Sequence, residues 1–143
     1  MKILVIDDER AIRNSLKEIL MLEGYEVETA ENGVQGIAMV EKEKYDVIFC
    51  DIKMPEMDGD EVLDRLVAMG IDAAIVMISG HGDINSAVAC IKRGAFDFIP
   101  KPLDLNRILI TIKNATEKVT LVKETKVLKK KVYGQEMIGE SEA

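Results

Sequence analysis

Five polar residues from four separate parts of the sequence each close or follow a short apolar run: Asp7, Asp8, Asp51, Ser79 and Lys101. The three carboxylates offer oxygen ligands with no clustered histidine beside them, a set that suits a hard divalent ion, Mg²⁺ or Mn²⁺. Carboxylates brought together repel one another unless a cation lies among them. A lysine and a hydroxyl beside that cation would complete a site for a phosphoryl group.

The five residues can meet only if the apolar runs are strands of one sheet. Near-continuous apolar runs such as 73–79 are typical of parallel strands that are covered on both faces. The predicted strands are 2–6, 26–30, 46–50, 73–79 and 95–99. The predicted helices are 9–24, 32–44, 58–70, 83–94 and a fifth that begins near Asp104, its N-cap candidate. This alternation predicts an α/β fold, a doubly wound five-stranded parallel sheet with right-handed crossovers.

In such a sheet, ligands bind beyond the carboxyl ends of the strands. Asp7 and Asp8 follow the first predicted strand, and Asp51 follows the third. Ser79 closes the fourth strand, and Lys101 comes just after the fifth. The sequence therefore predicts that all five side chains share one edge of the sheet.

Composition narrows the class of protein. The 143 residues suit one domain with a short extension, and the net charge of -7 argues against a general nucleic-acid surface. The two cysteines, Cys50 and Cys90, have no metal or redox spacing and are expected to be packed and reduced. The sequence shows neither a membrane-length apolar run nor a signal-peptide pattern. These features predict a cytoplasmic protein without a membrane partner.

Four short motifs, taken in order at the strand ends, resemble the receiver domains of two-component response regulators. The resemblance covers about residues 2–117, and it implies the flavodoxin-like receiver fold with strand order 2-1-3-4-5. The motifs are "DDE" (7–9), "DIKMPEMDG" (51–59), "SGHG" (79–82) and "KP" (101–102).

The resemblance implies a role for each acid. Asp51 would be the phosphoacceptor, attacking the phosphohistidine of a sensor histidine kinase. Asp7 and Asp8 would hold Mg²⁺ together with Asp51 and the backbone carbonyl of Lys53. The chain would then be a signalling switch and not an enzyme, since it would catalyse only its own phosphorylation and dephosphorylation.

The resemblance also implies how a phosphate would be sensed. Lys101 would pair with it, and the peptide bond that follows, before Pro102, would be cis. The hydroxyl of Ser79 would bind a phosphate oxygen, and Phe98 would act with Ser79 as the switch pair. Phe98 departs from the tyrosine frequent in the family, and a plain core role competes with switching. His81 lies close to the site, where it could influence phosphate hydrolysis or be only a surface residue.

Other interpretations remain open. Asp7 alone could be a helix cap. A haloacid-dehalogenase-type phosphatase also forms an aspartyl phosphate, but it carries a second acid where this chain has Lys53. A flavodoxin-like module for a nucleotide or flavin would need a phosphate-cradling loop after the first strand, and "DDERA" (7–11) would repel phosphate unless a metal intervenes.

The C-terminal part resembles a narrower group, the NtrC-type activators that work with sigma-54. The stretch 79–109 carries this likeness, and "MIGES" (137–141) resembles the opening of their AAA+ ATPase domain. We therefore expect a receiver domain at 1–117 and a helical linker at 118–143 that leads to an AAA+ domain absent from this chain. The resemblance implies AAA+ and DNA-binding domains in the full-length protein, with no direct nucleic-acid contact by this chain. A stand-alone receiver is the alternative.

An apolar stripe runs along the predicted last helix, 104–132. Its spacing fits the a/d seam of a short coiled coil and predicts a homodimer through the linker. The stripe consists of Leu105, Ile108, Ile112, Ala115, Val119 and Val122.

Overall fold

A computed structural model describes residues 1–80 and 84–117. The strands are β1 (Lys2–Ile6), β2 (Glu26–Ala30), β3 (Val47–Asp51), β4 (Ala74–Ser79) and β5 (Asp97–Pro100). They form one sheet in the order β2-β1-β3-β4-β5, and every neighbouring pair is parallel. The predicted doubly wound α/β fold, with its strand order 2-1-3-4-5, is confirmed.

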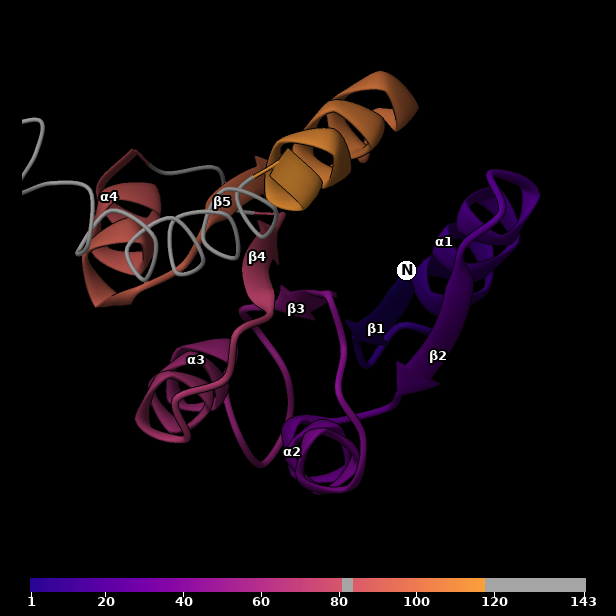
Figure 1. Cartoon of the computed structure of the whole chain (residues 1–143). Helices are drawn as coiled ribbons and strands as arrows, with labels where there is room; N and C mark the ends of the chain where they lie inside the picture. The colour runs from indigo at the N-terminus through magenta and orange to yellow at the C-terminus, as the bar shows by residue number, and fades with distance from the viewer. Residues whose placement is uncertain (81–83, 118–143) are drawn as a thin grey trace, which may run out of the picture.

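The helices cover both faces of this sheet (Figure 1). They are α1 (Arg10–Leu22), α2 (Gly33–Lys42), α3 (Gly59–Ala68), α4 (Ile84–Arg93) and an unlabelled C-terminal helix at 105–117, drawn in orange. Alternate residues of each strand point to opposite faces. On β1, Leu4 and Ile6 pack with residues of α2, α3 and α4, while Ile3 and Val5 pack with those of α1 and the C-terminal helix.

Local signals explain where several elements begin and end. The side chain of Asn32 accepts a hydrogen bond of 2.8 Å from the backbone N–H of Gln35 and so caps α2. Asp104 accepts one of 3.1 Å from the N–H of Asn106, as expected for the start of the C-terminal helix. Gly24 follows α1 at φ 90°, a left-handed conformation that glycine adopts readily. These ends lie within a few residues of the positions predicted from the sequence.

The apolar stripe of the C-terminal helix corrects one expectation. Ile108, Ile112 and Ala115 are at most 1% exposed, and they pack in the core of the protein's own sheet. The prediction that they belong to a coiled-coil seam is therefore wrong for these three residues. Helical periodicity shows that one face is buried, but it does not show against which surface. Val119 and Val122 lie outside the described residues.

Several other predictions also concern residues that the structure does not describe. These are the neighbourhood of His81, the helix between 118 and 132, and the linker at 118–143. Within the described ranges, no helix combines the length and the apolar character that crossing a membrane requires.

Candidate functional site at the carboxyl edge of the sheet

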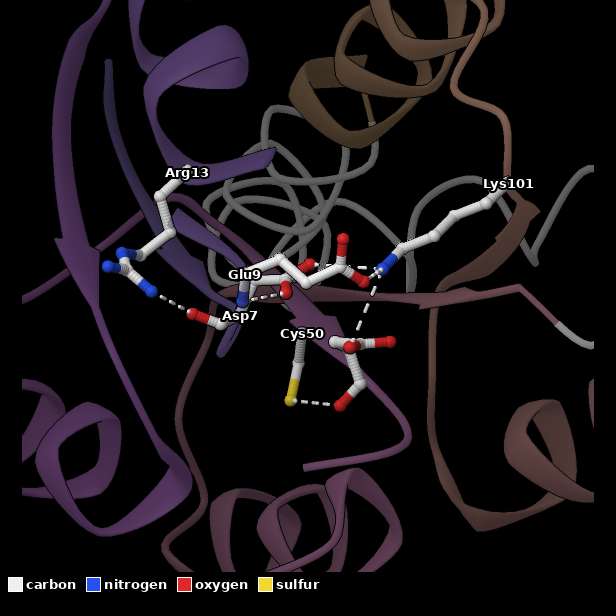
Figure 2. A network of polar contacts seen from close by, with 6 residues as sticks. Asp7, Glu9, Arg13, Cys50 and Lys101 are labelled. Carbon is white, nitrogen blue, oxygen red and sulfur yellow. Dashed lines mark hydrogen bonds and ion pairs between the residues drawn. The ribbon is translucent and has the colours of Figure 1, made fainter. Parts of the chain in front are cut away.

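The structure brings the predicted residues together at one edge of the sheet. Asp7 follows β1, Asp51 ends β3, Ser79 ends β4 and Lys101 follows β5. Lys101 Nζ lies 3.4 Å from Asp7 Oδ2 and 3.6 Å from Asp51 Oδ2. Figure 2 shows the lysine side chain reaching across the edge toward Asp7 and Glu9. Residues from distant parts of the sequence thus share one small volume.

Four carboxylates gather here, from Asp7, Asp8, Glu9 and Asp51, with one oxygen of each lying within 4.8 Å of the others. Asp7 and Asp51 are buried, whereas Asp8 and Glu9 are exposed. Asp7 Oδ2 is fully buried and has no hydrogen-bond partner among the described residues, and its contact with Lys101 is a long ion pair. An unsatisfied buried carboxylate oxygen within an all-oxygen group fits a hard divalent cation.

Burial and mutual repulsion alter the titration of these groups. Burial, together with the charge of Asp7, raises the pKa of Asp51 to about 6, although Lys101 partly offsets the effect. Burial also raises the pKa of Asp7. For Lys101, burial alone favours the neutral amine, but Glu9, Asp7 and Asp51 outweigh it and raise its pKa. The edge therefore holds a charged ammonium and two carboxylates whose ionised forms are unfavourable.

Three hydrogen bonds hold Asp7, two to its backbone and one to its side chain. Its N–H donates to Ala30 O at 3.1 Å, and its carbonyl accepts from Arg13 Nη1 at 2.8 Å. Its Oδ1 accepts from the N–H of Glu9 at 2.8 Å. These bonds leave Oδ2 as the atom that is aimed into the acid cluster.

The loop after Asp51 folds back beneath the end of β3. Gly59 donates to Ile52 O at 2.6 Å, and a Cβ at Gly59 would lie 2.2 Å from the carbonyl oxygen of Asp51. Any side chain at position 59 would therefore displace the backbone that carries Asp51. Glu56 in the same loop has φ 69°, an uncommon left-handed conformation for a residue other than glycine. Lys53, the proposed carbonyl ligand, is exposed in this loop.

Ser79 and Lys101 are linked through the backbone. The carbonyl of Ser79 accepts a hydrogen bond of 2.7 Å from the N–H of Lys101, and the side chain of Ser79 is buried. The Lys101–Pro102 peptide bond is cis, as the family resemblance implies. Phe98 is 8% exposed and packs in the core with Met77 and Cys90, so its ring points inward here. Whether Phe98 also switches stays a prediction.

Two residues of this edge were not predicted as parts of the site. Glu9 Oε1 lies 3.1 Å from Lys101 Nζ, although in the sequence Glu9 indicates only a helix start. Its place in the "DDE" motif was the available signal. Arg13, which binds the carbonyl of Asp7, gives no comparable signal, because an arginine one turn into a helix is usually a solvated side chain.

Comparison with known proteins identifies the family that the sequence motifs resemble, the receiver domains of response regulators. A model of the response regulator receiver domain matches residues 3–113. The nitrogen assimilation regulatory protein NtrX of Azorhizobium caulinodans is 38% identical over 141 residues, which are 97% of this chain but 31% of that relative. This chain therefore spans about a third of that protein's length.

Solved structures of similar proteins have the same fold as this chain. A crystal structure of NtrX from Brucella abortus in complex with ATP is 37% identical with a TM-score of 0.83, covering 89% of this chain and 29% of that one. The solution structure of the beryllofluoride-activated NtrC4 receiver domain dimer is 37% identical with a TM-score of 0.78, covering 82% of this chain and 98% of that one. The chain therefore belongs to the response regulator receiver domain family, and within that family it is similar to NtrC-type regulators.

Proposed function

We propose that Asp51 accepts a phosphoryl group from the phosphohistidine of a sensor histidine kinase. A carboxylate oxygen of Asp51 attacks phosphorus, an O–P bond forms, the P–N bond breaks, and the bonding pair leaves with the imidazole. The observation that supports this most directly is the arrangement of the edge. The carboxylate of Asp51 ends a central strand, faces a buried acid and lies 3.6 Å from the ammonium of Lys101.

Asp7, Asp8, Asp51 and the backbone carbonyl of Lys53 are the groups that would hold Mg²⁺ or Mn²⁺ at this edge. The bound ion would neutralise charge on the phosphoryl oxygens. Lys101 would pair with the phosphoryl group, to which its ammonium is already close. The Ser79 hydroxyl, at the end of the adjacent strand, would donate to a phosphoryl oxygen. Phe98 would then fill space that Ser79 vacates.

The switch would control a transcription activator of the sigma-54-dependent type. The similarity to NtrX supports this, and the part of the chain beyond 117 would connect the receiver to AAA+ and DNA-binding domains. The similar NtrC4 receiver, which forms a dimer in its beryllofluoride-activated state, supports a homodimer. Because Ile108, Ile112 and Ala115 lie in the core, linker-driven pairing would depend on residues beyond 117. We place the chain in the cytoplasm, and we propose no enzymatic activity beyond its own phosphorylation and dephosphorylation.

The acceptor is tested with small phosphodonors. The protein is incubated with Mg²⁺ and acetyl phosphate, and the intact mass is measured. We expect one phosphoryl group on the wild-type chain and none on Asp51→Asn. Asp72→Asn, which removes an exposed acid at the opposite end of the sheet, is the matched control and should be phosphorylated normally. Phosphorylation of Asp51→Asn at the wild-type yield would show that the acceptor is another residue.

A further inference from the structure

Glu9 occupies the N-cap position of α1 without capping it. Its side chain makes no cap hydrogen bond, and it turns instead toward Lys101, 92 positions away in the sequence. Figure 2 shows the carboxylate of Glu9 beside the ammonium of Lys101. The helix start is held by the backbone of Glu9, whose carbonyl accepts from Arg13 N at 3.1 Å. The local structure therefore does not require this orientation of the side chain.

Glu9 makes the shortest of three contacts to the same ammonium. Its Oε1 lies 3.1 Å from Lys101 Nζ, compared with 3.4 Å for Asp7 and 3.6 Å for Asp51. The side chain of Glu9 is 57% exposed, whereas that of Lys101 is 15% exposed. Lys101 thus lies between two buried carboxylates and one carboxylate at the solvent boundary. A cation held by the proposed ligands Asp7, Asp8 and Asp51 would neutralise both buried carboxylates. Glu9, the fourth carboxylate of the cluster, would then be the remaining partner of Lys101.

We propose that Glu9 is a positioning residue that holds Lys101 in the resting state and competes with the phosphoryl group for it. The inference rests on the function proposed above. A phosphoryl group on Asp51 replaces the single negative charge of the carboxylate with about one and a half to two negative charges beside the carboxylate of Glu9. One ammonium cannot neutralise both anions at close range, so the Glu9–Lys101 contact weakens when phosphate arrives. A contact made in one state and weakened in the other biases the equilibrium toward the first.

The test uses beryllofluoride as the phosphoryl analogue, titrated at saturating Mg²⁺ into the wild-type chain, Glu9→Gln and Glu9→Asp. Saturating Mg²⁺ separates this effect from any contribution of Glu9 to metal affinity. Glu9→Gln removes the charge, and Glu9→Asp keeps the charge but shortens the side chain so that it no longer reaches Lys101. We expect both variants to reach half-saturation at about two- to fivefold lower beryllofluoride, the range set by a partly exposed ion pair.

A second measurement examines the resting protein without metal or beryllofluoride. The side-chain Nζ and Cε resonances of Lys101, assigned with Lys101→Arg, should shift in both Glu9 variants because the contact is lost. If the wild-type chain binds beryllofluoride and both Glu9 variants reach half-saturation at the same concentration as wild type, this inference alone is overturned. Tighter binding by Glu9→Gln only would show that charge, and not the contact, matters, and would also overturn it. A wild-type chain that binds no beryllofluoride would overturn the proposed function as well.

Discussion

A lysine lies among carboxylates near each end of β1, Lys2 at the amino end and Lys101, which follows β5, at the carboxyl end. The two clusters differ in how many of their polar atoms have hydrogen-bond partners. At the amino end, Lys2 Nζ lies 3.1 Å from Glu28 and also pairs with Glu43. The hydroxyl of Tyr45 donates to Glu28 at 2.7 Å, and its ring lies 5.5 Å from the same ammonium. At the carboxyl end, Lys101 faces three acids, and Asp7 Oδ2 accepts no hydrogen bond from any described residue.

The titration of the acids reflects this difference. The hydrogen bond from Tyr45 and the proximity of Lys2 lower the pKa of Glu28. Burial and the charge of Asp7 raise the pKa of Asp51. The ionised form of Glu28 is thus stabilised by its surroundings, whereas that of Asp51 is destabilised until a cation arrives. Similar residue types therefore make a structural network at one end of β1 and a candidate binding site at the other.

The largest effect is expected from Asp51→Asn in metal-free buffer. Removing one of two buried, repelling carboxylates should raise the free energy of unfolding by roughly 1–2 kcal/mol. Urea denaturation at neutral pH measures the difference, and Asp72→Asn is the control, which should stay within about 0.5 kcal/mol of wild type. A less stable Asp51→Asn protein would contradict the view that repulsion between carboxylates at this edge destabilises the folded state.

The same substitution should change how stability depends on pH. The pKa of Asp51 is about 6 in the folded chain, above its ordinary value of 3.8. Between these values the folded state binds more protons than the unfolded state. The contribution of Asp51 to the free energy of unfolding therefore falls as pH rises from about 4 to about 6. The free energy of unfolding of the metal-free wild-type chain, measured across this range, should include this decrease, and Asp51→Asn should lack it. Identical pH profiles for the two proteins would contradict the raised pKa.

A smaller effect of opposite sign is expected at the amino end. Tyr45→Phe removes the hydrogen bond to Glu28 and should lower the free energy of unfolding by about 1 kcal/mol. Mg²⁺ should stabilise this variant as much as wild type, because Tyr45 lies at the other end of the sheet. Thermal melts with and without Mg²⁺ test both statements, with Tyr25→Phe as the aromatic control. A loss of the Mg²⁺ effect in Tyr45→Phe would show that the two clusters are not independent.

The smallest change in metal-free stability is expected from Asp8→Asn. Asp8 belongs to the acid cluster but is exposed, so removing its charge should relieve only a few tenths of a kcal/mol. The stabilisation by Mg²⁺ should nevertheless decrease clearly, since an oxygen ligand is lost. Melting temperatures over a Mg²⁺ titration separate the two effects. Intact Mg²⁺ affinity in this variant would remove Asp8 from the proposed ligand set.

The sequence by itself determined the fold and the location of the candidate site. Strand and helix signals are local, because apolar periodicity and turn residues act over a few positions. The rule that ligands bind beyond the carboxyl ends of parallel strands then placed Asp7, Asp51, Ser79 and Lys101 at one edge. The structure confirms that placement, with Asp7 and Asp51 each within 3.6 Å of Lys101.

Only the tertiary structure decided which partners these residues meet. Asp7 and Asp8 are adjacent and chemically alike, yet one is fully buried and the other exposed, because the backbone bonds to Ala30 and Arg13 orient Asp7 inward. The contact between Glu9 and Lys101 joins residues 92 positions apart. The stripe through Ile112 packs on the protein's own sheet, although its spacing equally suits a second helix. Such choices depend on packing between distant segments, which local sequence patterns do not encode.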